Sequence, residues 1–271
     1  MDKILEFETQ LAIRAAVESG RMASERPLHS AAVAKETSRD IVTPIDIAIE
    51  VHVRKLLADS GHPVIGEETN SDCRQIFEST PVWLVDPIDG TANYANGLDY
   101  FAVSVALCQC GDFLLGAVCV PRANELFCTF GRTRALLNGK TINHEHRSPN
   151  SSLVAASFSG AMGDILQRRK EYDLFGTIND RTRGCLRLGS AATNICFTAA
   201  GRLQAAYGIR AKIWDVAAGL AIAIGAGCKV AIAIAEDKTH IDYIVGSRET
   251  VDMIHELLFQ NGLMTEKCRI L

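Results

Sequence analysis

Apolar and polar positions along the chain follow two different periods, which predict helices in some segments and strands in others. Apolar residues at helical spacing predict helices over residues 5–22, 44–60, 164–174, 190–200, 214–226 and 247–260. Short runs rich in β-branched and aromatic residues predict strands over 62–65, 82–85, 100–109, 112–120, 125–130, 153–157, 185–188, 203–207, 229–235 and 241–245. This order predicts a mixed α/β (α+β) fold built of helix and sheet layers.

The connections divide the chain into two halves. Asn138 and Gly139, between two short strand-like runs, give the strongest hairpin signal, and residues 209–213 are expected to connect a strand to a helix. A polar segment near 148–150 separates an N-terminal half at 1–147, which carries the acidic loops, from a C-terminal half at 148–271. We expect the two halves to form one structural unit that shares one site.

The stretch 82–94 joins a buried strand to the sequence Asp-Pro-Ile-Asp-Gly-Thr. Asp86 and Asp89 are thereby held at the end of the strand, and Gly90 allows a sharp turn and close approach of a ligand to the backbone. Thr91 can open a helix whose free N–H groups bind phosphate. Carboxylates combined with a substrate phosphate are the usual ligands of magnesium. The alternative is an ordinary surface turn, since the same residue types are common turn formers.

The hexapeptide at 86–91 resembles the signature of the inositol monophosphatase family of magnesium-dependent, lithium-sensitive phosphatases. Upstream, residues 66–68 (Gly-Glu-Glu) are similar to the paired glutamates of that family, and 214–219 (Trp-Asp-Val-Ala-Ala-Gly) to its second signature. The motifs occur in the family's order across nearly the whole chain. The resemblance implies a layered αβαβα sandwich of the sugar-phosphatase type and a homodimer.

The resemblance also implies two or three magnesium ions in each active site. Their ligands would be four carboxylates and one main-chain carbonyl, from Glu67, Asp86, Asp89, Asp215 and Ile88. Asp86 would bridge two ions, and a water oriented by Glu67 and Thr91 would attack phosphorus in line. No covalent enzyme intermediate is implied.

Several of these residues also have a purely structural interpretation. Asp46, in the first turn of a helix that Thr43 can cap, suits the helix dipole, whereas the resemblance makes it the support of the catalytic Thr91. Asp215 could likewise be a helix cap rather than a metal ligand. Lys35 could be a solvated lysine in a polar loop, whereas the resemblance places it near the active site as a contact to phosphate or to metal-bound water.

Glu67 and Glu68 taken alone could form a charged loop after a strand. Because adjacent carboxylates point in different directions, they are not expected to share one task. The resemblance assigns Glu67 to the metal and to water activation, and Glu68 to an outer contact.

The resemblance extends to the substrate contacts. Phosphate would be bound by the N–H groups of Gly90 and Thr91, and the organic part by the segment Gly189, Ser190 and Ala191 at a second helix N-terminus. The complete expected set of substrate contacts is Ile88, Asp89, Gly90, Thr91, Gly189, Ser190, Ala191 and Asp215.

The sequence departs from the inositol-hydrolysing members at two places. Gly208 stands where they have a glutamate that holds inositol hydroxyls, and residues 225–228 (Gly-Ala-Gly-Cys) replace their Glu-Ala-Gly-Gly. Arg210 or Lys212 could instead favour a second anionic group. Inositol 1-phosphate is the first candidate substrate, with fructose 1,6-bisphosphate, histidinol phosphate and adenosine 3′,5′-bisphosphate as alternatives. A different class of function, regulation through a macromolecular partner such as RNA polymerase, also stays open.

Composition and charge reduce the classes of partner that we expect. The net charge of −4 indicates no nucleic-acid-binding surface, no apolar run reaches membrane-spanning length, and the first residues lack a signal-peptide pattern. Nine cysteines, scattered mostly in apolar runs, are typical of reduced thiols. We therefore expect a cytoplasmic enzyme that acts on a small phosphorylated metabolite, with no nucleic-acid or membrane partner.

The remaining metal-binding residue types are interpreted as structural. Cys108 and Cys110 are expected to share one face of a strand rather than to bind zinc. His144, His146 and Arg147 are expected to be solvated loop residues.

Overall fold

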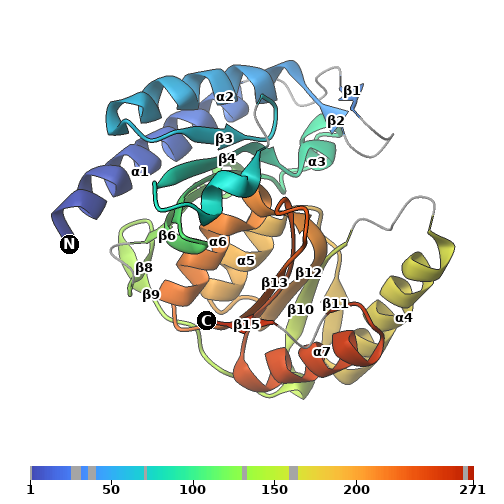
Figure 1. Ribbon diagram of the computed structural model, residues 1–271. Helices are drawn as coiled ribbons and strands as arrows, with labels where there is room; N and C mark the ends of the chain where they lie inside the picture. The colour runs from blue at the N-terminus through green and yellow to red at the C-terminus, as the bar shows by residue number, and fades with distance from the viewer. Residues whose placement is uncertain are drawn as a thin grey trace.

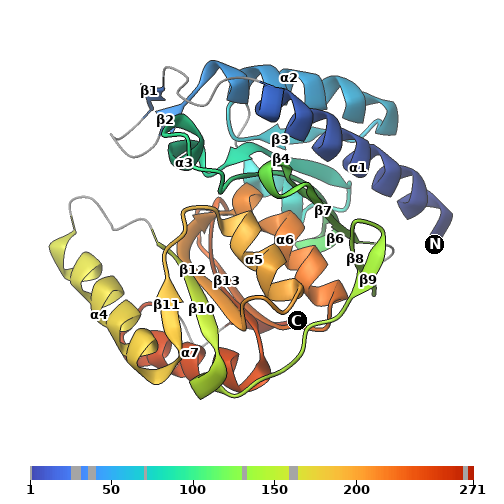
Figure 2. The same cartoon turned by 180° about the vertical axis from the view of Figure 1, so that it is seen from behind.

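The computed structural model describes residues 2–25, 32–35, 41–69, 72–129, 133–158, 164–264 and 268–271. Helix and sheet layers alternate through the molecule (Figure 1). The outer layer holds α1 (Asp2–Glu25) and α2 (Pro44–Leu57), the central one α5 (Ala191–Ala199) and α6 (Ile213–Gly225), and the opposite outer one α4 (Ile165–Arg181) and α7 (Arg248–Gln260). The view from behind shows the central pair between the two sheets (Figure 2). The predicted αβαβα sandwich is therefore confirmed.

In the described part of the chain, a seven-stranded sheet follows the order β3-β4-β5-β6-β7-β8-β9. Its strands are β3 (Val64–Gly66), β4 (Val82–Asp89), β5 (Ala102–Gln109), β6 (Asp112–Val120), β7 (Glu125–Thr129), β8 (Ala135–Leu137) and β9 (Lys140–Ile142). The β3–β4 pair is parallel and the other pairs are antiparallel. Between β8 and β9, Asn138 and Gly139 both have positive φ, as the predicted hairpin requires.

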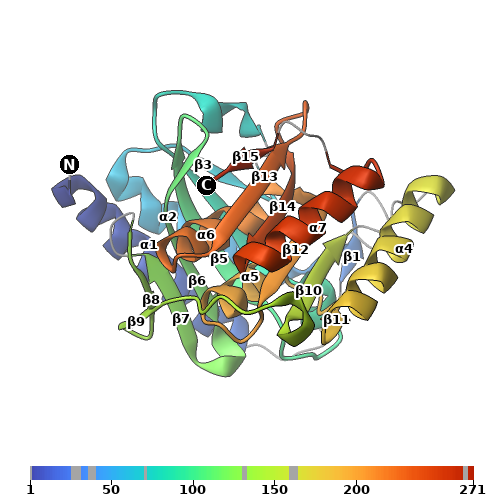
Figure 3. The same cartoon turned by 90° about the horizontal axis from the view of Figure 1, so that it is seen from below.

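A second sheet, six-stranded within the described residues, follows the order β11-β10-β12-β14-β13-β15. Its strands are β10 (Leu153–Phe158), β11 (Gly184–Leu186), β12 (Ala205–Lys212), β13 (Lys229–Ile234), β14 (His240–Gly246) and β15 (Arg269–Ile270). Seen from below, α4 and α7 lie across one face of this sheet (Figure 3). Two short elements stand outside both sheets near the site, namely the β1 (Val33–Ala34) and β2 (Ile41–Val42) pair and the helix α3 (Thr91–Ala95).

Apolar side chains of the described residues fill the spaces between the layers. Along β4 the side chains alternate, so that Trp83 and Val85 pack toward α1 and α2, whereas Val82 and Leu84 pack toward α5 and α6. The central helices approach the first sheet closely, because a Cβ added at Gly116 would overlap the backbone of α6. This alternation decides which way the end of β4 faces.

Three expectations from the sequence are wrong. Residues 209–213 are not a connector: β12 continues to Lys212 through an irregularity between Gly208 and Ala211, with a positive φ at Arg210. Cys110 lies exposed in a turn of positive φ, so it shares no strand face with buried Cys108. His144 is buried, and its ring nitrogens contact the Thr198 carbonyl and the Ser247 hydroxyl.

The chain passes from the first sheet to the second between β9 and β10. The division at 147/148 remains a prediction. Among the described residues, none of the helices combines the length and the apolar character needed to cross a membrane.

Candidate active site

The end of β4 and the end of β3 bring two carboxylates together. Asp86 has the same parity on β4 as Leu84, so it faces the central helices. The parallel register pairs Gly66 with Val85, and the Glu67 N–H donates to the Val85 carbonyl at 3.3 Å. Glu67 and Asp86 are therefore neighbours because of strand pairing.

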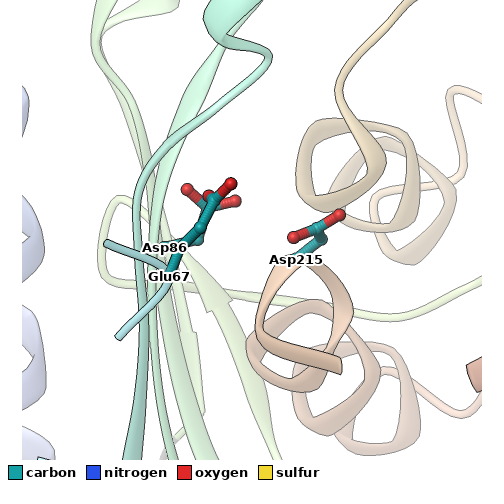
Figure 4. A group of neighbouring side chains, drawn as sticks. All are labelled: Glu67, Asp86 and Asp215. Atoms are coloured by element: carbon teal, nitrogen blue, oxygen red, sulfur yellow. The ribbon is translucent and has the colours of Figure 1, made fainter. Parts of the chain in front are cut away.

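The third carboxylate comes from the other half of the chain. Asp215 lies in the first turn of α6, whose contact with β6 places it opposite the end of β4. One carboxylate oxygen from each of Glu67, Asp86 and Asp215 lies within 4.8 Å of the others. Figure 4 shows Glu67 and Asp86 on one side and Asp215 facing them from its helix. We call these three residues the carboxylate cluster.

The carboxylate cluster concentrates negative charge around buried Asp86, while Glu67 and Asp215 are half-buried. Burial first, and then repulsion from neighbouring carboxylates, raises the pKa of Asp86 and that of Asp215 well above the ordinary value of 3.8. A divalent cation would compensate this charge, and carboxylate oxygens are the ligands that magnesium prefers. The donor set therefore fits a magnesium ion.

Asp89 points to a different element. Its two oxygens accept hydrogen bonds from the Ala191 N–H at 3.1 Å, from the Ala192 N–H at 2.7 Å and from the Ser190 hydroxyl. Burial raises the pKa of Asp89 to about 6, although these hydrogen bonds oppose the rise. The helix N-terminus expected to contact substrate is thus bound to Asp89, which lies outside the carboxylate cluster.

The loop after Asp89 is locked to the entry of α5. Gly90 has φ +100°, and a Cβ there would lie 3.1 Å from the carbonyl oxygens of Gly189 and Tyr100. The Asn93 amide donates to the carbonyls of Tyr100 (2.7 Å) and Leu188 (2.8 Å). These contacts of Asn93 were not predicted, although an asparagine two residues after the hexapeptide is a signal that could have suggested them.

Asp46 makes the helix-start contacts expected of it and also lies near Thr91. Its carboxylate accepts hydrogen bonds from the N–H and the hydroxyl of Thr43, which starts α2. The Thr91 hydroxyl lies 3.5 Å from Asp46 Oδ1 and 2.9 Å from the Ile88 carbonyl oxygen. Burial raises the pKa of Asp46 to about 6. Asp46 is therefore the acidic partner of the capping box at the start of α2, and it also lies beside Thr91.

Lys35 is not a solvated loop lysine. Its Nζ donates to Glu67 Oε1 at 2.9 Å and to Glu68 Oε1 at 2.6 Å. Burial alone would lower the pKa of Lys35, but the two glutamates raise it above its ordinary value. Burial raises the pKa of Glu68 to about 7 despite this contact. The positive charge of Lys35 thus lies against residues 67–69, which we call the glutamate loop.

The two cations near the second signature differ in position. Arg210 is 3.7 Å from Asp237, and its N–H donates to Asp242, so it belongs to its own hairpin. Lys212 has its Nζ 5.6 Å from the centre of the Trp214 ring, and its charge acts to lower the pKa of Asp215. Of these two residues, Lys212 is therefore the one whose charge can act on the site.

The sequence as a whole matches the inositol monophosphatase family over residues 1–260. The chain belongs to this family. The chain is accordingly a phosphatase of the inositol monophosphatase type, a metal-dependent family, and its carboxylate cluster is the candidate metal site.

Relatives support the assignment over most of the chain. The protein named inositol monophosphatase 2 of Solanum lycopersicum is 35% identical over 231 residues, covering 82% of this chain and 86% of that protein. The protein named Nus factor SuhB of Pasteurella multocida is 33% identical over 226 residues, covering 80% and 82%. The structure of Mycobacterium tuberculosis SuhB is similar with a TM-score of 0.79 at 25% identity, covering 96% of this chain and 98% of that one.

Proposed function

We propose that this inositol monophosphatase family member is a magnesium-dependent phosphomonoesterase for a small sugar or inositol phosphate, with inositol 1-phosphate as the first candidate. The carboxylate cluster carries the proposal, because it brings together donors from both halves of the chain around the buried Asp86. Magnesium would be held by Glu67, Asp86, Asp89, Asp215 and the Ile88 carbonyl. When bound, it would supply Lewis-acid charge for the phosphoryl oxygens and activate water.

The residues around the cluster would position the reactants. Glu67 and Thr91 would orient the attacking water. At pH 7.5 Asp46 is ionised because its pKa is about 6, so its carboxylate can accept a hydrogen bond from the Thr91 hydroxyl. The Thr91 oxygen can then accept one from the water. The N–H groups of Gly90 and Thr91, at the start of α3, would bind phosphate oxygens.

Position 208 offers no acidic side chain to the organic part of the substrate. This glycine pairs with Tyr243 across β12 and β14, and a Cβ on it would overlap the Tyr243 ring, which is fully buried. The Tyr243 ring thus fills the space that a glutamate side chain at position 208 would need. The hydroxyl groups of the substrate must be recognised by other residues.

We expect Gly208→Glu to destabilise the protein without improving inositol 1-phosphate hydrolysis. Overpacking of a well-filled site costs about 1–3 kcal/mol, so the melting temperature should fall by roughly 2–10 °C. Thermal unfolding and KM measurements check this. The double variant Gly208→Glu/Tyr243→Ala, which opens the space, is the control. A stable single variant with a lower KM would contradict the assignment.

The function is tested by phosphate release with and without magnesium. The panel holds inositol 1-phosphate, fructose 1,6-bisphosphate, histidinol phosphate and adenosine 3′,5′-bisphosphate. We expect magnesium-dependent release from inositol 1-phosphate above the other three. Faster release from a bisphosphate would favour the second anionic group that Lys212 could bind. Release that needs no magnesium, or no release from any ester, would overturn the proposal.

A second candidate function is regulation through a macromolecular partner, which the name of the Pasteurella relative favours. Binding of RNA polymerase or an associated factor, combined with no turnover of any phosphate ester, would support it. The homodimer, the cytoplasmic location and the lithium sensitivity remain predictions.

A further inference from the structure

A further buried acid, Glu50, lies directly behind the glutamate loop. It is on α2, one turn after Asp46, and is fully buried. It lies outside the carboxylate cluster, and the sequence motifs do not include it. A fully buried glutamate is uncommon and calls for partners.

Its partners belong to the segment that carries Glu67. Glu50 Oε2 accepts a hydrogen bond from the Glu68 N–H at 2.8 Å, and Oε1 accepts one from the Thr69 hydroxyl. Arg54 on the same helix pairs with Oε1 through Nη2 at 2.9 Å, and its Nη1 donates to the Val64 carbonyl at 2.7 Å. Together, Glu50 and Arg54 attach both ends of segment 64–69 to α2.

Gly66 shows how closely the segment surrounds this carboxylate. A Cβ on Gly66 would overlap the carboxylate of Glu50. Its φ is not positive, so steric contact rather than backbone conformation requires a glycine here. The space beside Gly66 is therefore reserved for the Glu50 carboxylate.

Two successive N–H groups of the loop are fixed from opposite sides. The Glu67 N–H donates to Val85 of β4, and the Glu68 N–H donates to Glu50 of α2. The direction of the Glu67 side chain depends on the peptide units on both sides of it. Lys35, from a segment more than 30 residues earlier in the chain, donates hydrogen bonds to the side chains of both Glu67 and Glu68.

We propose that Glu50 is a positioning residue that holds Glu67 in the orientation needed for metal binding. This inference rests on the proposed function, because it assigns Glu67 to the metal. Outer partners of metal ligands set the orientation of those ligands, and their loss typically lowers metal affinity or activity about 10–100-fold. Glu50 acts through the backbone of the loop and does not itself touch metal or substrate.

The test compares Glu50→Gln with Glu171→Gln, a matched control. Glu171 on α4 is equally buried but packs on the other sheet. Calorimetry with magnesium, and electron paramagnetic resonance with manganese, measure affinity without substrate. We expect Glu50→Gln to weaken metal binding about tenfold or more, and Glu171→Gln to lower the melting temperature only. Equal affinities of wild type and Glu50→Gln, or an equal loss in both variants, would overturn the proposal.

A milder variant keeps the test valid if Glu50→Gln does not fold. Thr69 is exposed, so Thr69→Val removes one hydrogen bond to Glu50 at little structural risk. We expect roughly two- to tenfold weaker metal binding, as one hydrogen bond contributes about 0.5–1.5 kcal/mol. Unchanged affinity in this variant would count against Glu50.

Activity distinguishes a positioning role from a general structural one. At saturating magnesium, Glu50→Gln should recover most of the wild-type kcat, because a higher metal concentration compensates for a weaker metal affinity. Its KM for inositol 1-phosphate should stay within about twofold of the wild-type value, because Glu50 does not touch substrate. If the wild type binds metal but hydrolyses no ester, the proposed function fails, while the metal affinities still decide the role of Glu50. If the wild type binds no metal, both fail.

Discussion

Replacing Asp86 with asparagine is expected to lower magnesium-dependent phosphatase activity about 1,000-fold or more. Asp86 is the buried member of the carboxylate cluster, so the substitution removes both a ligand and a charge from the donor set. A metal ion contributes several kcal/mol of transition-state stabilisation, and each 1.36 kcal/mol corresponds to a factor of ten in rate. Initial rates over a range of magnesium concentrations measure the effect.

The same substitution should stabilise the protein when no metal is present. The pKa of Asp86 is raised because its charge is buried among other carboxylates, and a neutral amide of the same shape removes that repulsion. At pH 8 in EDTA we expect the variant to melt above the wild type. Asp252→Asn, at an exposed side chain on α7, serves as the control with unchanged activity. An Asp86→Asn protein that remains active, or that melts lower without metal, would contradict this account.

The metal-free protein is expected to become more stable as the pH falls from 8 to about 5. Burial raises the pKa of Asp46 and Asp89 to about 6 and that of Glu68 to about 7. In the unfolded chain these groups titrate near their ordinary values of 3.8 and 4.5. Between the two sets of values the folded state binds more protons, so acidification through this window favours it.

The expected rise in melting temperature is roughly 5–10 °C, because a few kcal/mol are involved and each shifts a protein of this size by about 2–4 °C. Differential scanning calorimetry in EDTA from pH 8 to pH 5 measures it. Saturating magnesium at pH 8 should raise the melting temperature and flatten the pH dependence, since ligand at 100 times its Kd stabilises by about 2.7 kcal/mol. A melting temperature that falls steadily on acidification in EDTA would show that the folded state does not raise the pKa of these carboxylates.

The elements that carry the site could be predicted where the sequence is locally consistent. The apolar run before Asp86 can only be a buried strand, and Thr43 with Pro44 marks a helix start. The continuation of β12 through residues 209–212 could not be predicted in this way. The positive φ of Arg210 and the irregularity beside Gly208 depend on pairing with β14.

Contacts between residues far apart in the sequence limit how much of the site can be predicted. The order of the motifs predicted Glu67, Asp86 and Asp215 together, and strand register explains why the first two meet. Nothing in the sequence indicates that Asp89 binds the N-terminus of α5, about a hundred residues away along the chain. Nor does it show that Glu50 contacts the glutamate loop, since that contact arises only when α2 packs beside β3.

The origin of the carboxylate cluster in both halves of the chain matters during synthesis on the ribosome. Glu67 and Asp86 emerge early, whereas Asp215 emerges only after most of the chain has been made. A nascent chain that stops before α6 holds two of the three donors and lacks the helix that aligns the third. Binding of a metal ion by all three carboxylates therefore requires that α6 has packed against the first sheet.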